Sequence, residues 1–185
     1  EYISYGIEKS IQPKINIKQY SFIFPSFPNR GLLPLLKIFP KILQRYPQAT
    51  LNIFCNLDLP WTQRNFSKQI KLIKQLIIQP NVVNHGWVSQ TTLSKFWSES
   101  HVWLYPCIFE ETYCRITLEA AISKTLVITS PLGALTENVS DRGILVEGNA
   151  NTVDWETKAL DKLFGVLENK QLYDNYIEKN YQWAL

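Results

Sequence analysis

Methionine is absent from the 185-residue sequence, and cysteine occurs only three times. Because the cysteines are odd in number and form no CxxC pair, they argue against a disulfide framework and against a structural zinc site. We therefore expect a reducing, cytoplasmic location, with peripheral membrane attachment as the alternative. No apolar run approaches the roughly 18 residues of a membrane span, so we expect none in this piece. No run of five basic residues occurs, and we do not expect nucleic acid as a partner.

The residues that are present describe a folded domain. With 185 residues, the chain has room for one domain, or one domain and an arm, but not for two full-sized domains. Apolar residues make up 45% and charged residues 19%, which excludes a disordered chain and predicts a real core. The net charge of +3 fits a small anionic ligand about as well as no charged ligand. Because the sequence begins at Glu1 rather than Met, we expect it to be a piece of something longer.

Short apolar runs alternate along the chain with amphipathic stretches. We expect strands at residues 20–24, 50–54, 81–84, 101–105, 126–129 and 143–146. We expect helices at 31–46, 65–78, 91–98, 114–123, 152–169 and 171–185, with Pro40 kinking or breaking the first of them. Strands that alternate with helices need crossover connections, which predict a doubly wound, Rossmann-like α/β domain with a parallel sheet. Ligands of such a domain bind beyond the carboxyl ends of the strands, so the loops at that edge form the candidate site.

The loop after the first expected strand runs from Pro25 to Gly31 and opens a helix. Unpaired N–H groups at a helix N-terminus suit phosphate, and Arg30 adds a full positive charge on a planar donor fork. The alternative is that Ser26 or Asn29 merely caps the helix and that Arg30 is solvated. The chain contains neither the GxxxxGK of a P-loop nor the GxGxxG of a dinucleotide-binding turn.

A second loop, residues 108–114, carries Glu111 and enters a helix that carries Glu119. We expect both carboxylates near the strand-end crevice, where they would accept hydrogen bonds from the vicinal hydroxyls of a ribose or a hexose. The free N–H groups of residues 112–114 would serve the phosphates between them. The alternative is that Glu111 only stabilises a helix start and that Glu119 is a surface residue. However, the apolar neighbours of Glu119 predict partial burial, and a buried acid needs a partner.

Other features of the sequence carry less information. Trp61 and Trp87 lie in crevice-side loops and could stack on a base, although packing is the simpler interpretation. Gly133 permits a turn that leads into a further helix. Cys114 at a helix N-terminus could have a lowered pKa, but no histidine or asparagine partner for a thiol enzyme is identifiable. Neither histidine has metal-like spacing to cysteine or acidic residues.

The segment Glu111-Thr-Tyr-Cys-Arg-Ile-Thr-Leu-Glu119 separates two glutamates by seven residues, after a strand and before Ala-Ala. It resembles the acidic motif of the retaining nucleotide-sugar glycosyltransferases of the GT-B fold, glycosyltransferase family 4 (group 1). Further segments resemble family motifs in the same order: Tyr5-Gly-Ile7, Ser26 to Leu32, Asn84 to Val88, Trp103 to Pro106, Leu126 to Thr129, Gly133 to Leu135 and Arg142 to Val146. The resemblance covers nearly the whole chain and implies the C-terminal, donor-binding half of a GT-B fold.

The resemblance also implies a role for particular residues. Glu111 would be the catalytic residue and contact the donor sugar near its reacting carbon. The donor-binding residues would be Ser26, Arg30, Gly31, Thr112, Tyr113 and Cys114 around the diphosphate, Glu119 at the ribose hydroxyls, and Trp87 and Val88 against the base. The nucleotide-sugar donor is thus the implied ligand. No metal and no other cofactor is implied, because basic residues and helix ends stabilise the leaving diphosphate.

The chain departs from the family pattern near both motifs. Pro25 stands where the family has an arginine, so one phosphate contact is missing or replaced. Lys124 stands where the family has a glycine, and we consider it a candidate replacement for that arginine. A positive φ at this position would strain a lysine. Thr112 and Cys114 stand in place of glycines and are expected to narrow the sugar pocket.

The expected domain organisation follows from the same resemblance. Residues 1–185 form a single donor-binding domain, with 1–18 as the interdomain crossing segment and 170–185 as the start of a C-terminal crossing helix. The N-terminal acceptor domain is missing from the sequence, so we expect this piece to transfer little or no sugar alone. Two alternatives remain: a non-catalytic nucleotide or sugar-phosphate binding module, and a structural α/β domain with a decayed site.

Overall fold

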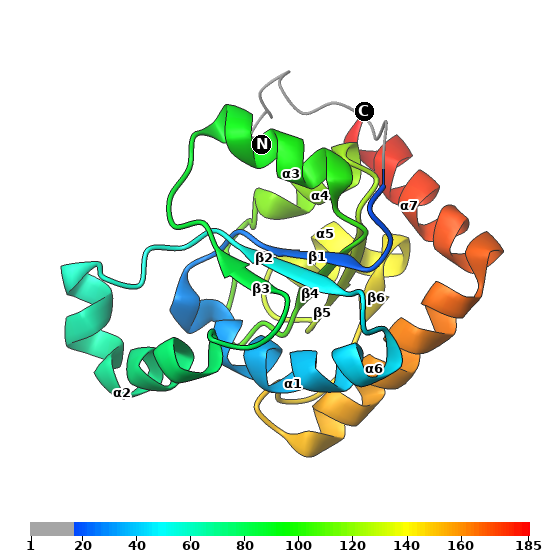
Figure 1. Ribbon diagram of the computed structural model, residues 1–185. Helices are drawn as coiled ribbons and strands as arrows, with labels where there is room; N and C mark the ends of the chain where they lie inside the picture. The colour runs from blue at the N-terminus through cyan, green and yellow to red at the C-terminus, as the bar shows by residue number, and fades with distance from the viewer. Residues whose placement is uncertain (1–16) are drawn as a thin grey trace.

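The computed structural model describes residues 17–185. Its centre is a six-stranded sheet (Figure 1), whose strands are β1 (Ser21–Phe24), β2 (Thr50–Ile53), β3 (Val82–Asn84), β4 (Val102–Tyr105), β5 (Leu126–Thr129) and β6 (Ile144–Leu145). The spatial order is β3-β2-β1-β4-β5-β6, and all neighbouring strands are parallel. The predicted doubly wound, Rossmann-like α/β fold is thereby confirmed. Nearly all of the expected crossing segment 1–18, including Tyr5-Gly-Ile7, lies outside the described residues.

The central strands are buried on both faces. β1, β4 and β5 read Ser-Phe-Ile-Phe, Val-Trp-Leu-Tyr and Leu-Val-Ile-Thr, and every residue in them is buried. A parallel sheet with helices on both faces requires such continuous runs instead of alternating polar and apolar residues. The register pairs Phe24 with Ile53 and Tyr105 with Thr129, so the loops that follow these strands start side by side.

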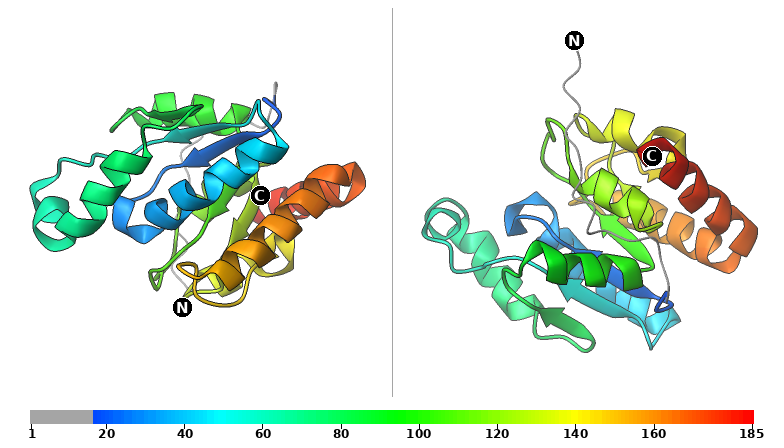
Figure 2. Two further views of the ribbon diagram at one scale, coloured as in Figure 1. Left: turned by 60° about the horizontal axis from the view of Figure 1, so that its bottom comes forward. Right: turned by 90° about the horizontal axis from the view of Figure 1, so that it is seen from above.

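Helices cover both faces of the sheet. In Figure 1, α1 (Leu32–Arg45), α2 (Pro60–Leu76) and α6 (Val153–Glu168) lie below the sheet, and α3 (Gln90–Glu99), α4 (Ile116–Ile122) and α5 (Leu135–Val139) lie above it. Figure 2 shows these layers from two further directions. α7 (Lys170–Ala184) packs against both α6 and α4. The helix expected from residue 171 is therefore present, and its role as the start of a crossing helix stays a prediction.

Of the two effects expected at Pro40, a kink or a break, the break is wrong, because α1 continues through this residue from Leu32 to Arg45. Proline lacks the N–H group that would bond the carbonyl four residues earlier, which belongs to Leu36. That carbonyl instead accepts a hydrogen bond of 3.0 Å from Nε2 of Gln79. Pro40 itself is exposed, so its ring displaces no core side chain. A side chain from outside the helix thus satisfies the group that proline leaves unbonded.

α2 begins at Pro60, earlier than the predicted start at Asn65. Proline suits the first turn of a helix, where its missing N–H group has no intrahelical partner to lose. The backbone leaves the helical region at Phe66, with φ −133° and ψ 29°, so the regular part of α2 follows a kink next to the predicted start. Two short 3-10 helices, η1 (Pro28–Arg30) and η2 (Ser140–Arg142), were not predicted.

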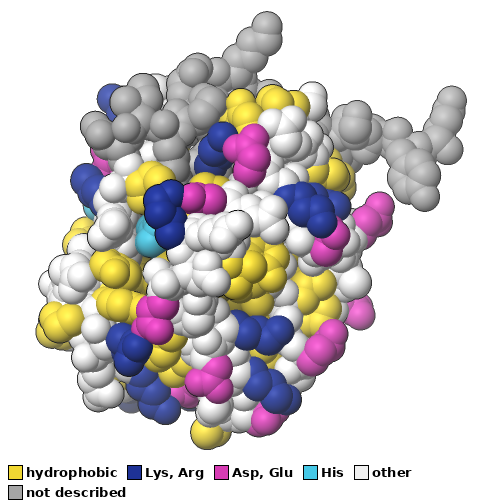
Figure 3. Space-filling model, turned by 90° about the vertical axis from the view of Figure 1, so that its right-hand side faces the viewer, with side chains coloured by type: hydrophobic (Ala, Val, Ile, Leu, Met, Phe, Trp, Pro, Cys, Tyr) yellow, Lys and Arg dark blue, Asp and Glu magenta, His cyan; other side chains and the backbone are white. Residues whose placement is uncertain are grey.

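The surface that carries α7 mixes charges of both signs with apolar side chains (Figure 3). Lys124 Nζ lies 2.6 Å from an oxygen of Glu178, and Lys179 forms an ion pair with Asp141, so both pairs join α7 to the body of the domain. Exposed pairs of this kind each contribute at most about 1 kcal/mol to stability. Across residues 17–185, we find no helix with the length and apolarity needed to cross a bilayer.

Candidate functional site

Two loops meet closely at the carboxyl edge of the sheet, one after β1 and one after β4. Gly31, between η1 and α1, has a φ of +132°, a conformation that L side chains rarely adopt. A Cβ atom at Gly31 would lie only 2.5 Å from the backbone oxygen of Pro106. Glycine is therefore required here by both its backbone conformation and the close approach of the second loop. The predicted donor-binding role of Gly31 stays a prediction.

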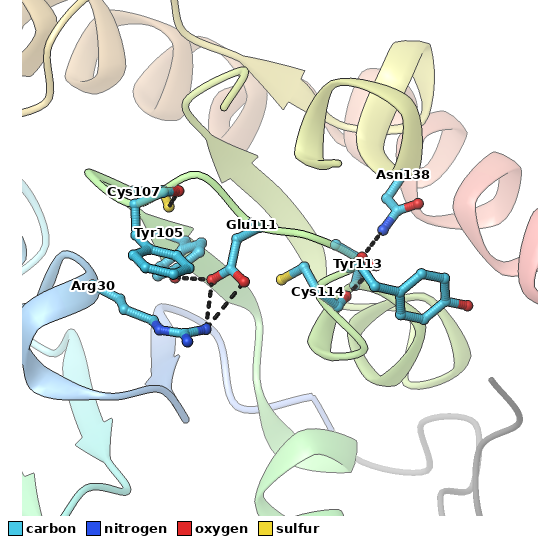
Figure 4. A network of polar contacts seen from close by, with 9 residues as sticks. Arg30, Tyr105, Cys107, Glu111, Tyr113, Cys114 and Asn138 are labelled. Carbon is cyan, nitrogen blue, oxygen red and sulfur yellow. Dashed lines mark hydrogen bonds and ion pairs between the residues drawn. The ribbon is translucent and has the colours of Figure 1, made fainter. Parts of the chain in front are cut away.

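A third loop, after β5, joins the second. Glu111 forms an isolated parallel bridge with Gly133, and the Ala134 N–H donates to the Glu111 carbonyl over 2.7 Å. Gly133 has a φ of +56°, and a Cβ atom there would lie 2.3 Å from that same carbonyl oxygen. The backbone of Glu111 is consequently fixed by the loop of the neighbouring strand, which leaves its side chain to point toward the first loop (Figure 4).

Arg30 and Glu111 form the central contact of the site (Figure 4). Nη1 of Arg30 donates to both carboxylate oxygens of Glu111, at 3.2 and 3.1 Å. The hydroxyl of Tyr105 donates to the Oε1 atom of Glu111 at 2.7 Å. The side chain of Glu111 is only 5% exposed, whereas that of Arg30 is 30% exposed. The carboxylate is therefore satisfied from inside the protein, and the guanidinium keeps a solvent-facing side.

Aromatic rings hold the guanidinium in place. Its central carbon lies 4.1 Å from the ring centroid of Phe109 and 5.6 Å from that of Phe27. A guanidinium stacked on rings gains cation–π attraction and loses little freedom when it binds an anion. The alternative of a solvated Arg30 is therefore wrong. The capping alternative is also wrong, since no side-chain cap precedes η1 or α1.

Burial sets the protonation of the groups around Glu111. It raises the pKa of Tyr105, and Cys107 and Glu111 add to the rise, while an interaction with Ser26 opposes it. Tyr105 therefore stays a neutral hydrogen-bond donor toward the carboxylate. Burial also raises the pKa of the Cys114 thiol, with Glu111 contributing in the same direction. The lowered pKa expected for Cys114 is thus wrong, because desolvation outweighs the effect of the helix start.

Glu119 is buried, as expected from its apolar neighbours, at 3% exposure. The indole Nε1 of Trp97 donates to Oε2 of Glu119 at 3.0 Å, and Nε2 of Gln90 donates to Oε1 at 3.3 Å. The guanidinium Nε of Arg115 lies 3.7 Å from Oε1. The alternative of a surface glutamate is wrong. The indole of Trp97 therefore bonds one carboxylate oxygen, and Gln90 and Arg115 contact the other at longer distances.

A cavity of about 240 Å³ borders Arg30, and neither Glu111 nor Glu119 is part of its lining. Its lining consists of Pro25, Ser26, Phe27, Pro28, Arg30, Phe54, Cys55, Asn56, Trp87 and Ile116. Ile116 stands three residues before Glu119 at the start of α4, so the arginine loop and the acid-bearing helix border the same hollow. The structure therefore brings together three of the sequence-predicted residues, Ser26, Arg30 and Trp87, in its lining.

The remaining predicted donor-binding residues lie beside the cavity or away from it. Val88 is half-buried and packs on the core instead of lining the hollow. Thr112 is exposed, and the carbonyl of Tyr113 accepts a hydrogen bond from Asn138. Cys114 has a φ of +57°, the left-handed conformation that a glycine would adopt more easily.

Lys124 has the backbone conformation that was expected for it, but not the role in phosphate binding. Its φ is +51°, so the lysine does occupy the left-handed region in which strain was predicted. Its ammonium is paired with Glu178 and lies 4.4 Å from the ring centroid of Tyr181, both on α7. Lys124 is therefore committed to α7 and does not replace the arginine that is missing at Pro25.

The sequence interpretation missed four residues of the site. Tyr105 ends β4, Phe54 and Asn56 follow β2, and Phe109 lies in the second loop. All four stand at or just after the carboxyl end of an expected strand, which was the available signal. Their side chains are aromatic or amide groups without a motif, so nothing in the sequence distinguished them from packing residues.

Known proteins with similar sequences and folds are glycosyltransferases. An uncharacterized glycosyltransferase of Methanocaldococcus jannaschii is 27% identical over 180 residues, which are 92% of this chain and 44% of the relative. The chain thus spans less than half of that protein. The crystal structure of the C-terminal domain of a group 1 glycosyl transferase from Francisella tularensis has a TM-score of 0.72 at 17% identity, covering 94% of this chain and 93% of the other.

A third similar protein is Anabaena HepE, whose crystal structure was determined in complex with UDP-glucose. The TM-score is 0.69 at 17% identity, over 89% of this chain and 43% of HepE. At such identities the likeness establishes the fold, which is that of the C-terminal domains of GT-B glycosyltransferases. The family model described as glycosyl transferases group 1 matches residues 21–163. The chain therefore belongs to the group 1 glycosyl transferase family.

Proposed function

We propose that this chain binds the nucleotide diphosphate sugar donor of a retaining, metal-independent glycosyltransferase, and that it transfers no sugar without an acceptor-binding domain. The observation that carries the proposal is Arg30, stacked on Phe109, paired with Glu111 and still partly exposed beside the 240 Å³ cavity. A diphosphate offers a guanidinium a stronger partner than one carboxylate does, because it carries more charge and more acceptor oxygens. Donor binding then exchanges Glu111 for phosphate on Arg30.

The exchange gives Glu111 its proposed catalytic role. Once Arg30 engages the diphosphate, the Glu111 carboxylate keeps its bond from Tyr105 and faces the sugar with a full negative charge. Departure of the diphosphate leaves positive charge on the sugar, which a nearby carboxylate stabilises. Arg30 stabilises the opposite charge on the leaving group. The two residues therefore serve the two ends of the bond that breaks, and no step of this account requires a metal ion.

The nucleoside has proposed partners in Glu119 and Trp87. Oε1 of Glu119 accepts the 3.3 Å bond from Gln90 and lies 3.7 Å from Arg115 Nε, and in this proposal ribose hydroxyls displace Gln90 and donate to the carboxylate. Trp87 is 65% exposed and lines the cavity, which suits stacking on a base. UDP is the first nucleotide to test, because HepE, which shares the fold, was solved with UDP-glucose.

The test is a thermal-shift panel of UDP, GDP, ADP and TDP, each with its glucose conjugate. A ligand at one hundred times its dissociation constant stabilises the folded state by about 2.7 kcal/mol. We expect the nucleotides of one base, with or without glucose, to raise the melting temperature of the domain clearly. If no member of the panel shifts melting, the donor-binding proposal fails.

A comparison of variants separates an enzyme from a non-catalytic module. If Glu111 contacts the donor sugar, Glu111→Gln weakens binding of the nucleotide sugar relative to the bare nucleotide. A module that holds only the nucleotide would show the same affinity ratio in the variant and in the wild type. Calorimetric titration with the preferred nucleotide and its sugar conjugate measures this ratio.

A further inference from the structure

A second and larger cavity, of about 590 Å³, adjoins the first. It is lined by Phe27, Asn29, Arg30, Leu59, Pro60, Trp61, Trp87 and Phe109. Three of these residues, Phe27, Arg30 and Trp87, also line the smaller cavity. The two hollows are therefore adjacent and share the arginine that we assign to the diphosphate. None of the donor-binding roles proposed above uses Leu59, Pro60 or Trp61.

Aromatic rings dominate the larger cavity and remain open to solvent. Trp61 is 57% exposed, and Phe27 and Phe109 are 43% and 38% exposed. Large aromatic side chains left exposed around one hollow indicate a binding surface, because isolated exposure is common but clustered exposure is not. The rings of Trp61 and Phe66 pack at an interplanar angle of 61° with centroids 5.5 Å apart, and Trp61 remains 57% exposed beside this contact.

The polar groups of this cavity select among possible occupants. Among residues 17–185, Arg30 is the one charged residue that lines it, and no carboxylate does. The occupant is therefore neutral or anionic. The amide oxygen of Asn29 is buried and has no hydrogen-bond partner among residues 17–185. It can therefore accept a hydrogen bond from a ligand without losing an existing one. Flat rings with one amide and one guanidinium suit a molecule that has an apolar face and a rim of hydroxyls.

A pyranose ring has that chemistry, since its axial C–H bonds form an apolar face and its hydroxyls lie around the edge. The position of the cavity agrees with this assignment. Phe109 stacks on Arg30 and stands two residues before Glu111, so the cavity borders the loop that carries the proposed catalytic residue. An acceptor bound beside this loop would be near the proposed reaction centre.

We propose that the cavity around Trp61 and Phe109 is an acceptor subsite for a neutral sugar ring, located on the donor-binding domain itself. The proposal rests on the function proposed above. It assigns the recognition of the acceptor in part to this chain and identifies the acceptor as a carbohydrate.

Saturation-transfer NMR tests the subsite directly. The probes are methyl α-glucoside, methyl α-galactoside, methyl α-mannoside and N-acetylglucosamine, each added to the chain with and without saturating UDP. We expect at least one sugar to receive saturation at its ring C–H protons, and to keep doing so when UDP is bound. Trp61→Ala should weaken this binding about fivefold or more, as the loss of one stacking partner predicts.

Trp183→Ala is the matched control, because Trp183 is a partly exposed tryptophan on α7 that lines neither cavity. It should leave sugar binding unchanged. Circular dichroism melting tests whether both variants are folded. If Trp61→Ala is unfolded, Phe109→Leu serves as a second variant of the cavity. UDP affinity should stay within twofold in Trp61→Ala, since Trp61 lines only the larger cavity.

The outcomes separate the subsite from the donor site. UDP binding without sugar binding overturns the subsite and leaves the proposed function standing. Sugar binding that survives Trp61→Ala, or that UDP abolishes, also overturns the subsite, because the sugar then lies elsewhere. Binding of hexyl phosphate in place of every sugar would identify a lipid-type occupant and contradict the proposal. Sugar binding without any nucleotide binding would sink the proposed function but not the carbohydrate site.

Discussion

Arg30 and Glu111 stand 81 positions apart in the sequence, and their charged groups lie 3.1 Å apart in the structure. The contact follows from the topology, because β1 and β4 are neighbours in the sheet and each residue lies in the loop after one of these strands. The pair neutralises a carboxylate that is almost fully buried. It also means that an anion which takes the Nη1 group of Arg30 must compete with Glu111.

Glu111→Gln should therefore increase the affinity for inorganic pyrophosphate. A charge-assisted hydrogen bond exceeds a neutral one by about 1 kcal/mol, which corresponds to roughly fivefold in the dissociation constant. Isothermal titration with pyrophosphate measures the effect. Glu110→Gln is the matched control, because Glu110 is an exposed neighbour and its change alters the net charge equally. An equal gain in both variants would mean that only net charge matters.

Tyr105→Phe should lower the stability of the fold. The hydroxyl bonds a buried carboxylate, and the loss of one such bond costs about 1–3 kcal/mol. Urea unfolding followed by circular dichroism measures the change. Tyr181→Phe should have almost no effect, since the ring under Lys124 is retained. Equal stabilities for the two variants would show that the Tyr105 bond contributes nothing.

Glu119→Gln should weaken UDP binding more than it weakens pyrophosphate binding. Pyrophosphate has no ribose, so its affinity reports only on the phosphate part of the site. The variant keeps the shape of the side chain but loses the charge that makes it a strong acceptor for hydroxyls. Parallel titrations with both ligands give the two losses, and equal losses would remove the ribose role of Glu119.

Gly133→Ala should destabilise the domain by about 2 kcal/mol or more, because the new Cβ would meet the Glu111 carbonyl at 2.3 Å in a left-handed backbone conformation. Gly165→Ala is the opposite case. A Cβ atom at Gly165, inside α6, would meet nothing within 4 Å. That substitution should stabilise the fold by about 0.5–1 kcal/mol. Thermal melting of the two variants should move in opposite directions, and a shared direction would contradict the account.

The fold was predictable from the sequence because local patterns determine it. Continuous apolar runs such as those of β1, β4 and β5 predict central parallel strands, and their order of alternation with helices leaves few topologies. The break predicted at Pro40 is absent, and the Leu36 carbonyl that proline leaves unbonded accepts a hydrogen bond from Gln79, which is distant in the sequence. No local rule includes such a partner.

The site was predictable in part. Arg30, Glu111 and Glu119 stand out as charged residues next to expected strand ends or inside an apolar stretch. Their pairing partners, Tyr105 for Glu111 and Trp97 for Glu119, are ordinary core residues whose role depends on side-chain direction. The competition between Glu111 and a phosphate for Arg30 is likewise a property of the folded loops. Charge and spacing locate the candidates, and only the packed structure shows which of them already bind one another.

The most direct test of the central claim is the affinity of Arg30→Ala for UDP, measured by isothermal titration beside the wild type. Arg64→Ala, an exposed arginine on α2, serves as the control for lost charge. A charged hydrogen bond of about 1.5–3 kcal/mol predicts that Arg30→Ala binds UDP at least tenfold more weakly, while Arg64→Ala stays within twofold. Equal UDP affinity in the wild type and Arg30→Ala would contradict the assignment of the diphosphate to this arginine.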